Sequence, residues 1–256
     1  MNNKDGAYNY KISETSIDDP SSENWIDILE HRDQVLLEDF EIFSDHWVVT
    51  ERENGLTRIK VKRWDETEDY FIPVSGETYS LSGGLNLNFE TSNFRFVYTS
   101  LSTPTTIFEY EMNSKTKKML KQRSVPNSNF KSDNYIEKRL WANSRDGEKI
   151  PISLVYHKDT ELDSNTPLLL YAYGSYGYTI DPYFSSNRLS LLNRGFIYAI
   201  VHVRGGQYLG RAWYEKGKLL NKKNTFNDFI DSTKFLINSG ISSADHMHEI
   251  GRASCR

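Results

Sequence analysis

Short runs that alternate apolar and polar residues fill most of the chain between residues 35 and 123. Val, Ile, Tyr, Phe, Trp and Thr dominate these runs, and the turn formers Asn54-Gly55, Ser82-Gly83-Gly84 and Pro104 separate them. A period of two residues places one face of a strand in a core and the other face in water. The pattern therefore predicts strands at residues 35–43, 46–51, 56–64, 70–74, 94–100, 105–112 and 118–123.

These strands also form a weak internal repeat with an offset of about 48 residues, in the range typical of four-stranded propeller blades. The offset places Val48-Val49 on Phe96-Val97, Thr57-x-Ile59 on Thr105-x-Ile107 and Trp64 on Met112. It predicts two blades, with a partial blade in residues 8–30. A small β-sandwich with coincidental spacing is the alternative.

A different pattern follows residues 124–133, a stretch of turn formers without periodicity that reads as a linker. Residues 135–142 and 149–156 form two β runs joined through Asp146-Gly147, a strong hairpin signal. Residues 168–173 and 196–201 are apolar on both faces, as in strands of a parallel sheet covered by helices. Residues 186–193 supply a crossover helix between them. The predicted fold is mixed: a partial β-propeller followed by the first half of an α/β domain.

The clearest predicted helix lies between Thr225 and Gly240. Thr225 can cap it, and Asp228 in its first turn complements the helix dipole. Its apolar stripe consists of Phe226, Phe229, Ile230, Thr233, Leu236 and Ile237. A third parallel strand is expected next, but residues 245–251 are too short and too polar for a buried central strand.

Composition narrows the class of protein. The chain has 256 residues with 31 Lys and Arg against 35 Asp and Glu, a net charge of −4, so a basic nucleic-acid-binding protein is not expected. Its apolar runs are shorter than the roughly 20 residues that span a bilayer, so no membrane partner is expected either. The start lacks a signal peptide and the only cysteine is Cys255, which together predict a cytoplasmic protein.

Several residues could carry chemistry but are better explained structurally. His202 lies between two valines of a predicted strand and is expected to be a core histidine. His246 and His248 alternate, but no cysteine or carboxylate cluster completes a metal site, so no metal or other cofactor is predicted. The loop at 204–207 lacks the Lys-Ser/Thr pair of a phosphate-binding loop. Lys218, Lys222 and Lys223 are expected to form a solvated face.

Four motifs of the second half carry a resemblance to a known family. They are Arg145-Asp146-Gly147-Glu148-Lys149-Ile150-Pro151, Tyr171-Ala172-Tyr173-Gly174-Ser175-Tyr176-Gly177, Ile200-Val201-His202-Val203-Arg204-Gly205-Gly206, and Trp213-Tyr214 through Asn224-Thr225-Phe226-Asn227-Asp228. In order and spacing they resemble the prolyl oligopeptidase family of serine peptidases, most of all its oligopeptidase B (protease II) branch. The resemblance implies a seven-bladed propeller, an α/β-hydrolase domain with a Ser-Asp-His triad, and cleavage of short peptides, in that branch after Lys or Arg.

The resemblance assigns one catalytic group to this sequence. Tyr173 matches the family's second tyrosine, whose hydroxyl helps to bind the oxyanion, while Ala172 replaces a glycine of the motif. The nucleophile of such enzymes sits in a Gly-x-Ser-x-Gly turn and precedes the other two triad members in the chain. This sequence contains no such turn, and Ser254 lacks the flanking glycines and any downstream Asp or His. The expected triad is therefore missing.

These observations predict residues 1–130 as propeller blades, 131–251 as the first half of a peptidase domain, and 252–256 as a tail outside the family. We expect a truncated serine peptidase that is inactive alone because its triad is missing. A noncatalytic binding or scaffold module is the alternative, as is one half of a split peptidase whose partner is a separately encoded C-terminal fragment.

Overall fold

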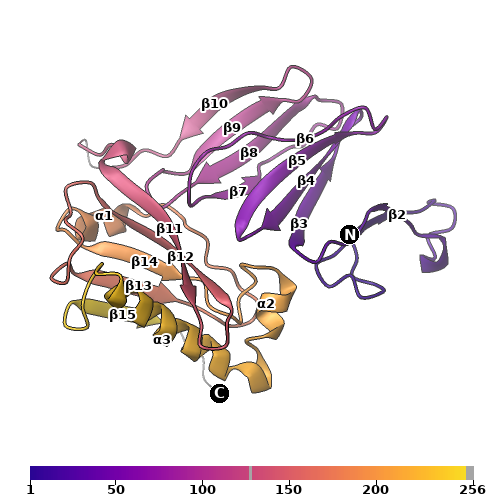
Figure 1. Cartoon of the computed structure of the whole chain (residues 1–256). Helices are drawn as coiled ribbons and strands as arrows, with labels where there is room; N and C mark the ends of the chain where they lie inside the picture. Colours follow the sequence, from indigo (N-terminus) through magenta and orange to yellow (C-terminus); the bar gives the residue numbers. More distant parts are fainter. Residues whose placement is uncertain (127–128, 252–256) are drawn as a thin grey trace.

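The computed structural model describes residues 1–126 and 129–251, and it contains two four-stranded antiparallel sheets, a five-stranded mixed sheet and a small two-stranded sheet (Figure 1). The first large sheet comprises β3 (Val35–Ile42), β4 (His46–Glu53), β5 (Leu56–Arg63) and β6 (Asp69–Phe71). The second comprises β7 (Ser80–Gly83), β8 (Asn93–Thr99), β9 (Thr106–Glu111) and β10 (Thr116–Gln122). The two-stranded sheet pairs β1 (Ile12–Glu14) with β2 (Ile26–Leu29).

The strands of each four-stranded sheet are adjacent in the order of the chain, β3-β4-β5-β6 and β7-β8-β9-β10. This meander is the arrangement of a propeller blade, whereas a Greek-key sandwich distributes neighbouring strands over two sheets. The seven predicted strands are all present. The sequence pattern missed β7, because its residues include Ser82 and Gly83, which read as a turn.

The two blades share one apolar core, which explains the alternating pattern of their strands. In β5 the side chains of Thr57, Ile59 and Val61 are buried, while the intervening lysines and arginines are only partly covered. The shared core contains Phe43, Val48, Ile59, Val61, Ile72, Tyr79, Leu81, Phe94, Phe96, Tyr110 and Met112. Burial of these side chains fixes the register of both sheets.

The predicted repeat holds for one strand and fails for another. Val48 of β4 and Phe96 of β8 are both buried in the shared core, as the offset predicts. The offset also pairs Ile59 with Ile107, but Ile59 is fully buried whereas Ile107 is only half-buried. The loops between strands differ in length, so a single offset cannot align every strand of the two blades.

The second half of the chain forms a sheet with strand order β11-β12-β14-β13-β15. The hairpin of β11 (Tyr135–Asn143) and β12 (Lys149–His157) is antiparallel, as predicted, and β12 also pairs antiparallel with β14 (Ile197–Val201). β13 (Leu168–Ala172) is parallel to β14, and the crossover between them contains α1 (Ser186–Leu192). The predicted parallel unit is thus present.

Residues 245–251 do not form a buried central strand, as expected, but part of this stretch forms a third parallel strand at the edge of the sheet. β15 (Met247–Gly251) pairs in parallel with β13, from Leu168 opposite Met247 to Ala172 opposite Gly251. Backbone hydrogen bonds pair the strand regardless of its polar side chains. The polarity shows instead in burial, because every residue of β15 after Met247 is exposed.

The short helix α2 (Arg211–Glu215) precedes the long helix α3 (Lys223–Asn238). Helix α3 begins earlier than predicted, and less of its apolar stripe is buried than predicted. Thr225 does not cap α3, because it lies inside the helix and donates its hydroxyl hydrogen bond to the carbonyl oxygen of Arg204, at 2.7 Å. Asp228 pairs with a buried arginine rather than with the helix terminus. Phe226 and Ile230, assigned to the apolar stripe, are 40% and 45% exposed.

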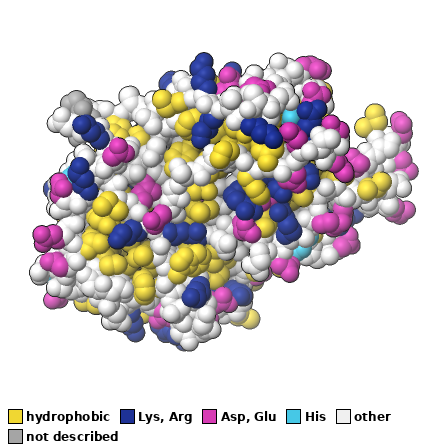
Figure 2. Space-filling model, turned by 45° about the horizontal axis from the view of Figure 1, so that its top comes forward, with side chains coloured by type: hydrophobic (Ala, Val, Ile, Leu, Met, Phe, Trp, Pro, Cys, Tyr) yellow, Lys and Arg dark blue, Asp and Glu magenta, His cyan; other side chains and the backbone are white. Residues whose placement is uncertain are grey.

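The visible face of the molecule mixes both charge signs, and Lys and Arg side chains lie among Asp and Glu without gathering into one basic patch (Figure 2). No helix within the described ranges is long and apolar enough to span a bilayer.

Candidate functional site

Tyr173 directly follows β13, at the carboxyl end of the parallel strands, where α/β folds place their ligands. Its side chain is half-buried, and its ring packs edge-on against Tyr178 with 5.8 Å between ring centres. Within residues 1–126 and 129–251 no hydrogen bond engages its hydroxyl. The phenol hydroxyl is therefore available to donate to another group.

Close backbone packing fixes the segment that carries Tyr173. A Cβ on Gly174 would lie 2.6 Å from Val203 Cγ2 and 2.7 Å from the carbonyl oxygen of Arg204, so only glycine fits there. Gly205 has a φ of +98°, which favours glycine as well. The amide of Gly177 donates to the carbonyl oxygen of Gly205 at 3.0 Å. The loop after β13 and the loop after β14 therefore hold each other in place.

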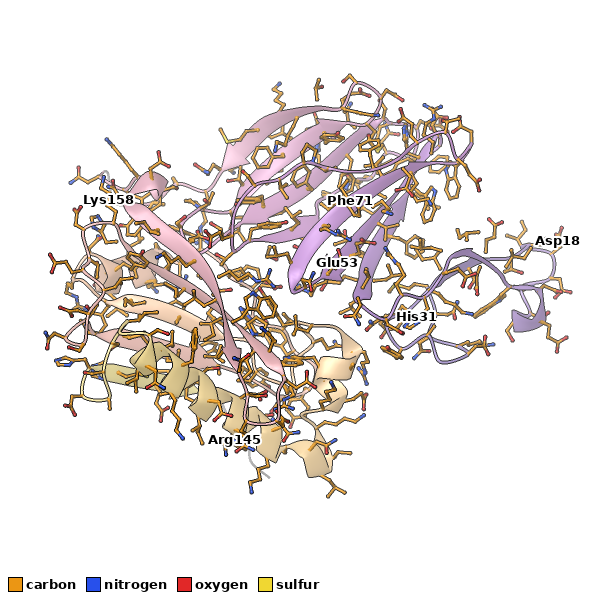
Figure 3. The ribbon with its side chains drawn as sticks, in the orientation of Figure 1. Asp18, His31, Glu53, Phe71, Arg145 and Lys158 are labelled. Atoms are coloured by element: carbon orange, nitrogen blue, oxygen red, sulfur yellow. The ribbon has the colours of Figure 1, made fainter. Side chains whose placement is uncertain are left out.

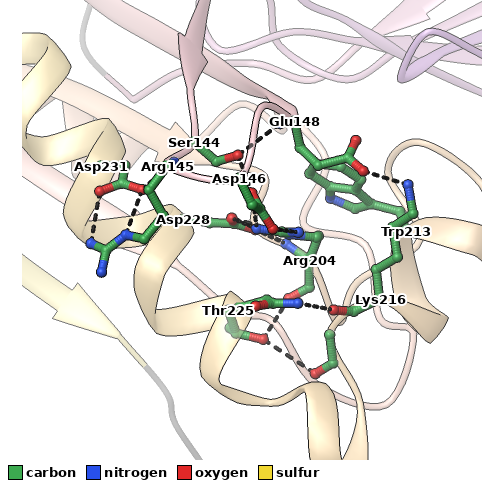
Figure 4. A network of polar contacts seen from close by, with 12 residues as sticks. Ser144, Arg145, Asp146, Glu148, Arg204, Trp213, Lys216, Thr225, Asp228 and Asp231 are labelled. Atoms are coloured by element: carbon green, nitrogen blue, oxygen red, sulfur yellow. Dashed lines mark hydrogen bonds and ion pairs between the residues drawn. The ribbon is translucent and has the colours of Figure 1, made fainter.

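Arg204 ties this pair of loops to the rest of the hydrolase-like sheet (Figure 4). Its guanidinium, only 2% exposed, donates to Asp228 on α3 at 2.5 to 3.1 Å and to Asp146 in the β11–β12 turn at 2.6 and 3.1 Å. Hydrogen bonds from Arg204 and Ser144 lower the pKa of Asp146 to about 2. Burial alone would lower the pKa of Arg204, but the hydrogen bonds with both carboxylates raise it above its ordinary value.

This arrangement supports the interpretation of residues 204–207 as a structural loop. The side-chain amide of Gln207 donates to the carbonyl oxygen of Gly177 at 3.1 Å, so Gln207 also joins the two loops. No anion-binding arrangement of backbone amides is needed to explain the loop.

Lys222 is not part of a solvated face, contrary to the expectation. Its ammonium group is partly buried, donates to Ser175 Oγ at 2.8 Å and also hydrogen-bonds to the carbonyl oxygen of Gly174. A cation just before the first turn of α3 opposes the helix dipole, so this placement has an electrostatic cost. The two hydrogen bonds to the loop after Tyr173 offset that cost. Lys218, in contrast, pairs with Glu215 at the surface.

A cavity of about 420 Å³ opens beside this segment. Apolar side chains of α3 form one wall, and Lys222 and Glu249 place opposite charges at its lining. The residues around it are Ala172, Gly174, Ser175, Val203, Lys222, Thr225, Phe226, Phe229, Ile230, Glu249 and Gly251. Glu249 and Gly251, near the end of β15, thus lie in the cavity wall.

Ser153 and His202 lie close enough for a nucleophile–base pair, but both are sealed from solvent. Ser153 Oγ lies 2.8 Å from His202 Nε2, but the two residues are 0% and 4% exposed, respectively. The His202 ring stacks on Tyr208 at 3.5 Å, and burial together with the charges of Arg52 and Arg139 holds the pKa of His202 well below its usual range. His202 is a core histidine, as expected, although it lies just after β14 rather than within it.

The remaining sequence candidates do not form sites. His246 Nδ1 lies 3.1 Å from Ser243 Oγ, and the ring of His248 packs near Phe196. Among the described residues no group of three or more His, Cys, Asp or Glu side chains could hold a metal ion. Ser254 and the predicted tail 252–256 lie outside the described residues.

Comparison with known proteins gives the relationship directly. A sequence profile described as the N-terminal β-propeller domain of prolyl oligopeptidase matches residues 1–123, and a profile described as the prolyl oligopeptidase family matches residues 182–253. The chain belongs to the prolyl oligopeptidase family. Its fold is accordingly a partial propeller followed by the start of a hydrolase domain.

Individual relatives match nearly the whole chain. Dipeptidyl aminopeptidase BI of Pseudoxanthomonas mexicana is 46% identical over 97% of the chain, and Protease 2 of Moraxella lacunata is 34% identical over 95%. Oligopeptidase B of Leishmania major superimposes with a TM-score of 0.90 at 36% identity over 98% of the chain. The chain covers 34% of each of the first two proteins and 36% of the third, so it spans about a third of their length.

Proposed function

We propose that this chain forms the last propeller blades and the oxyanion-binding edge of an oligopeptidase B-like serine peptidase that hydrolyses short peptides after Lys or Arg. In this proposal residues 1–130 belong to the propeller and residues 131–251 to the first half of the peptidase domain. The protein acts in the cytoplasm and needs no cofactor.

The position of Tyr173 carries the proposal. Tyr173 directly follows the carboxyl end of β13, and no other described residue hydrogen-bonds to its hydroxyl. Its neighbours Ala172 and Gly174 line the cavity, and glycine contacts and Lys222 fix the segment. A preorganised donor of this kind stabilises negative charge that develops in the transition state of acyl transfer. The similarity to oligopeptidase B of Leishmania major and to Protease 2 of Moraxella lacunata supports the same assignment.

The sequence supplies no nucleophile for this edge. It has no Gly-x-Ser-x-Gly segment followed by an Asp and a His. Among the described residues, the pair Ser153–His202 is sealed in the core, and the pair Ser243–His246 lies in the turn before β15, away from the end of β13 that carries Tyr173. An oxyanion donor contributes little without the groups that it assists. We therefore propose that residues 1–256 alone do not hydrolyse peptides.

A fluorophosphonate probe and an Arg-containing fluorogenic peptide test this proposal. The chain alone should neither be labelled nor cleave the peptide. A fusion of residues 1–251 to the remaining C-terminal part of the Pseudoxanthomonas mexicana relative should do both. Activity of the chain alone would contradict the inactivity, and an inactive but folded fusion would contradict the peptidase assignment.

A split peptidase is the second candidate, and the exposed apolar surface around the cavity favours it. Phe226 and Ile230 on α3 and Ile250 on β15 are 40%, 45% and 55% exposed, an arrangement suited to cover by further polypeptide. Adding the C-terminal part as a separate chain should then restore labelling. Binding without restored labelling would instead favour a noncatalytic scaffold.

A further inference from the structure

The first blade and the hydrolase-like sheet meet at a buried ion cluster that no catalytic role requires. Arg52 lies on β4 and is only 3% exposed, although it carries a guanidinium group. Asp181 lies in the loop that follows β13, 129 residues further along the chain, and its side chain is 9% exposed. A charged pair this deeply buried at a seam between domains is uncommon.

The geometry of the pair is bidentate. Arg52 Nη1 donates to Asp181 Oδ1 at 2.8 Å, and Nη2 donates to Oδ2 at 3.0 Å. The third nitrogen, Nε, donates to Glu38 Oε1 on β3 at 2.5 Å, and Nη1 also donates to the carbonyl oxygen of Gly55 at 2.9 Å. All three nitrogens of the guanidinium thus donate, two of them across the seam.

Neighbouring side chains shield this cluster from water. The ring of Tyr208, from the hydrolase-like part, is buried beneath the guanidinium, whose carbon lies 5.5 Å from the ring centre. Tyr208 also packs directly on the backbone of Gly55 in the β4–β5 turn. Tyr183 donates a further, longer hydrogen bond of 3.3 Å to Asp181. The low local dielectric strengthens the ion pair and makes the loss of either partner costly.

The loop that carries Asp181 is the same loop that begins at Tyr173. It is fixed at its near end by Gly174 and Lys222, and near its far end the amide of Phe184 donates to Thr99 Oγ1 of the second blade at 3.2 Å. Its middle is held by Arg52. Separation of the first blade from the hydrolase-like sheet must therefore break the Arg52–Asp181 pair.

We propose that the Glu38–Arg52–Asp181 cluster is a clasp that closes the first blade onto the loop after β13 and keeps that loop ordered. Glu38 holds the guanidinium ready on the blade side, and Asp181 receives it from the other side. Opening of the seam frees the loop and exposes Tyr208. The clasp joins two parts of this chain and does not require peptidase activity.

Hydrogen–deuterium exchange of the whole chain under native conditions tests the clasp, with the variants Asp181→Asn and Arg52→Lys. The first removes one charge at constant shape, and the second keeps the charge but loses the two-pronged contact. Asp231→Asn is the matched control, because Asp231 accepts the same kind of bidentate contact from Arg145 at 2.8 and 3.0 Å (Figure 4). Arg145 lies in the hydrolase-like part (Figure 3).

The clasp predicts faster exchange on both sides of the seam. Peptides covering residues 47–56 and 174–185 should exchange about a hundredfold faster in both variants, because breaking a buried pair weakens closure by that order. Peptides from the core of β8 and β14 should not change, and Asp231→Asn should leave the seam unchanged. Unchanged exchange at the seam, an increase on one side only, or an equal increase in every peptide would overturn the proposal.

Discussion

The substitution Gly55→Ala adds one methyl group where the propeller contacts the hydrolase-like part, so it tests how closely the two parts pack. Gly55 has a φ of +82°, and a Cβ built on it would lie 2.5 Å from Tyr208 Cδ1 and 2.7 Å from Cζ. Neither atom belongs to a flexible chain end, because Tyr208 is buried and stacked on His202. The substitution therefore perturbs both the backbone conformation and the seam.

The two costs can be separated. Placing alanine in the left-handed region costs about 1 kcal/mol, and forcing a methyl group into a packed interior costs about 2 kcal/mol more. Gly147→Ala pays only the first cost, because Gly147 has a φ of +89° but no atom lies within 4 Å of its Cβ position. We expect a loss of about 3 kcal/mol for Gly55→Ala and about 1 kcal/mol for Gly147→Ala.

Thermal unfolding measures this difference. At roughly 2–4 °C per kcal/mol for a chain of this size, Gly55→Ala should melt about 4–8 °C below Gly147→Ala. Adding Tyr208→Leu to Gly55→Ala should recover part of the gap, since the smaller side chain makes room. Equal melting temperatures for the two glycine variants would refute the close contact across the seam.

Three further changes have definite expected outcomes. Lys222→Met should lower the free energy of unfolding by about 2 kcal/mol in urea titrations, since it removes two charge-assisted hydrogen bonds, whereas Lys223→Met, at the exposed neighbouring position, should change it little. Arg204→Met should cost about 3–5 kcal/mol because it leaves Asp228 unpaired in the core, while Arg145→Met, at a half-exposed pair, should cost less than about 1 kcal/mol. The pKa of His202 is depressed in the folded state, so its contribution to stability is present above about pH 6.5 and is lost as the pH falls through the folded pKa. Melting temperatures of His202→Gln should therefore fall less between pH 7 and pH 5 than those of the parent chain.

Sequence periodicity predicted the secondary structure well where the burial of apolar side chains decides it. Alternation in residues 56–63 gave β5, and the doubly apolar run at 168–172 gave β13, because burial on one or both faces leaves a direct trace in the sequence. The polar residues 245–251 correctly excluded a buried central strand, but they did not reveal the backbone pairing of the edge strand β15 with β13.

The site was predicted only in part, for a related reason. Tyr173 came from a motif, but Lys222 was read as a surface lysine, and Arg52 and Asp181 drew no attention. Their roles arise from contacts across 48 to 129 residues of chain, which one sequence does not record. Lys222 and Lys223 lie just before the predicted helix start at Thr225, where cations are disfavoured, and this was the one available signal for Lys222.

The central proposal is that Tyr173 is the oxyanion donor of a peptidase active site, and the turnover of the fusion enzyme tests it most directly. In the fusion with the C-terminal part of the Pseudoxanthomonas mexicana relative, Tyr173→Phe should lower kcat for an Arg-containing peptide by about 10²- to 10³-fold. Tyr178→Phe, which removes the hydroxyl of the ring packed against Tyr173, should leave kcat nearly unchanged. Equal kcat values for the two variants would contradict the account.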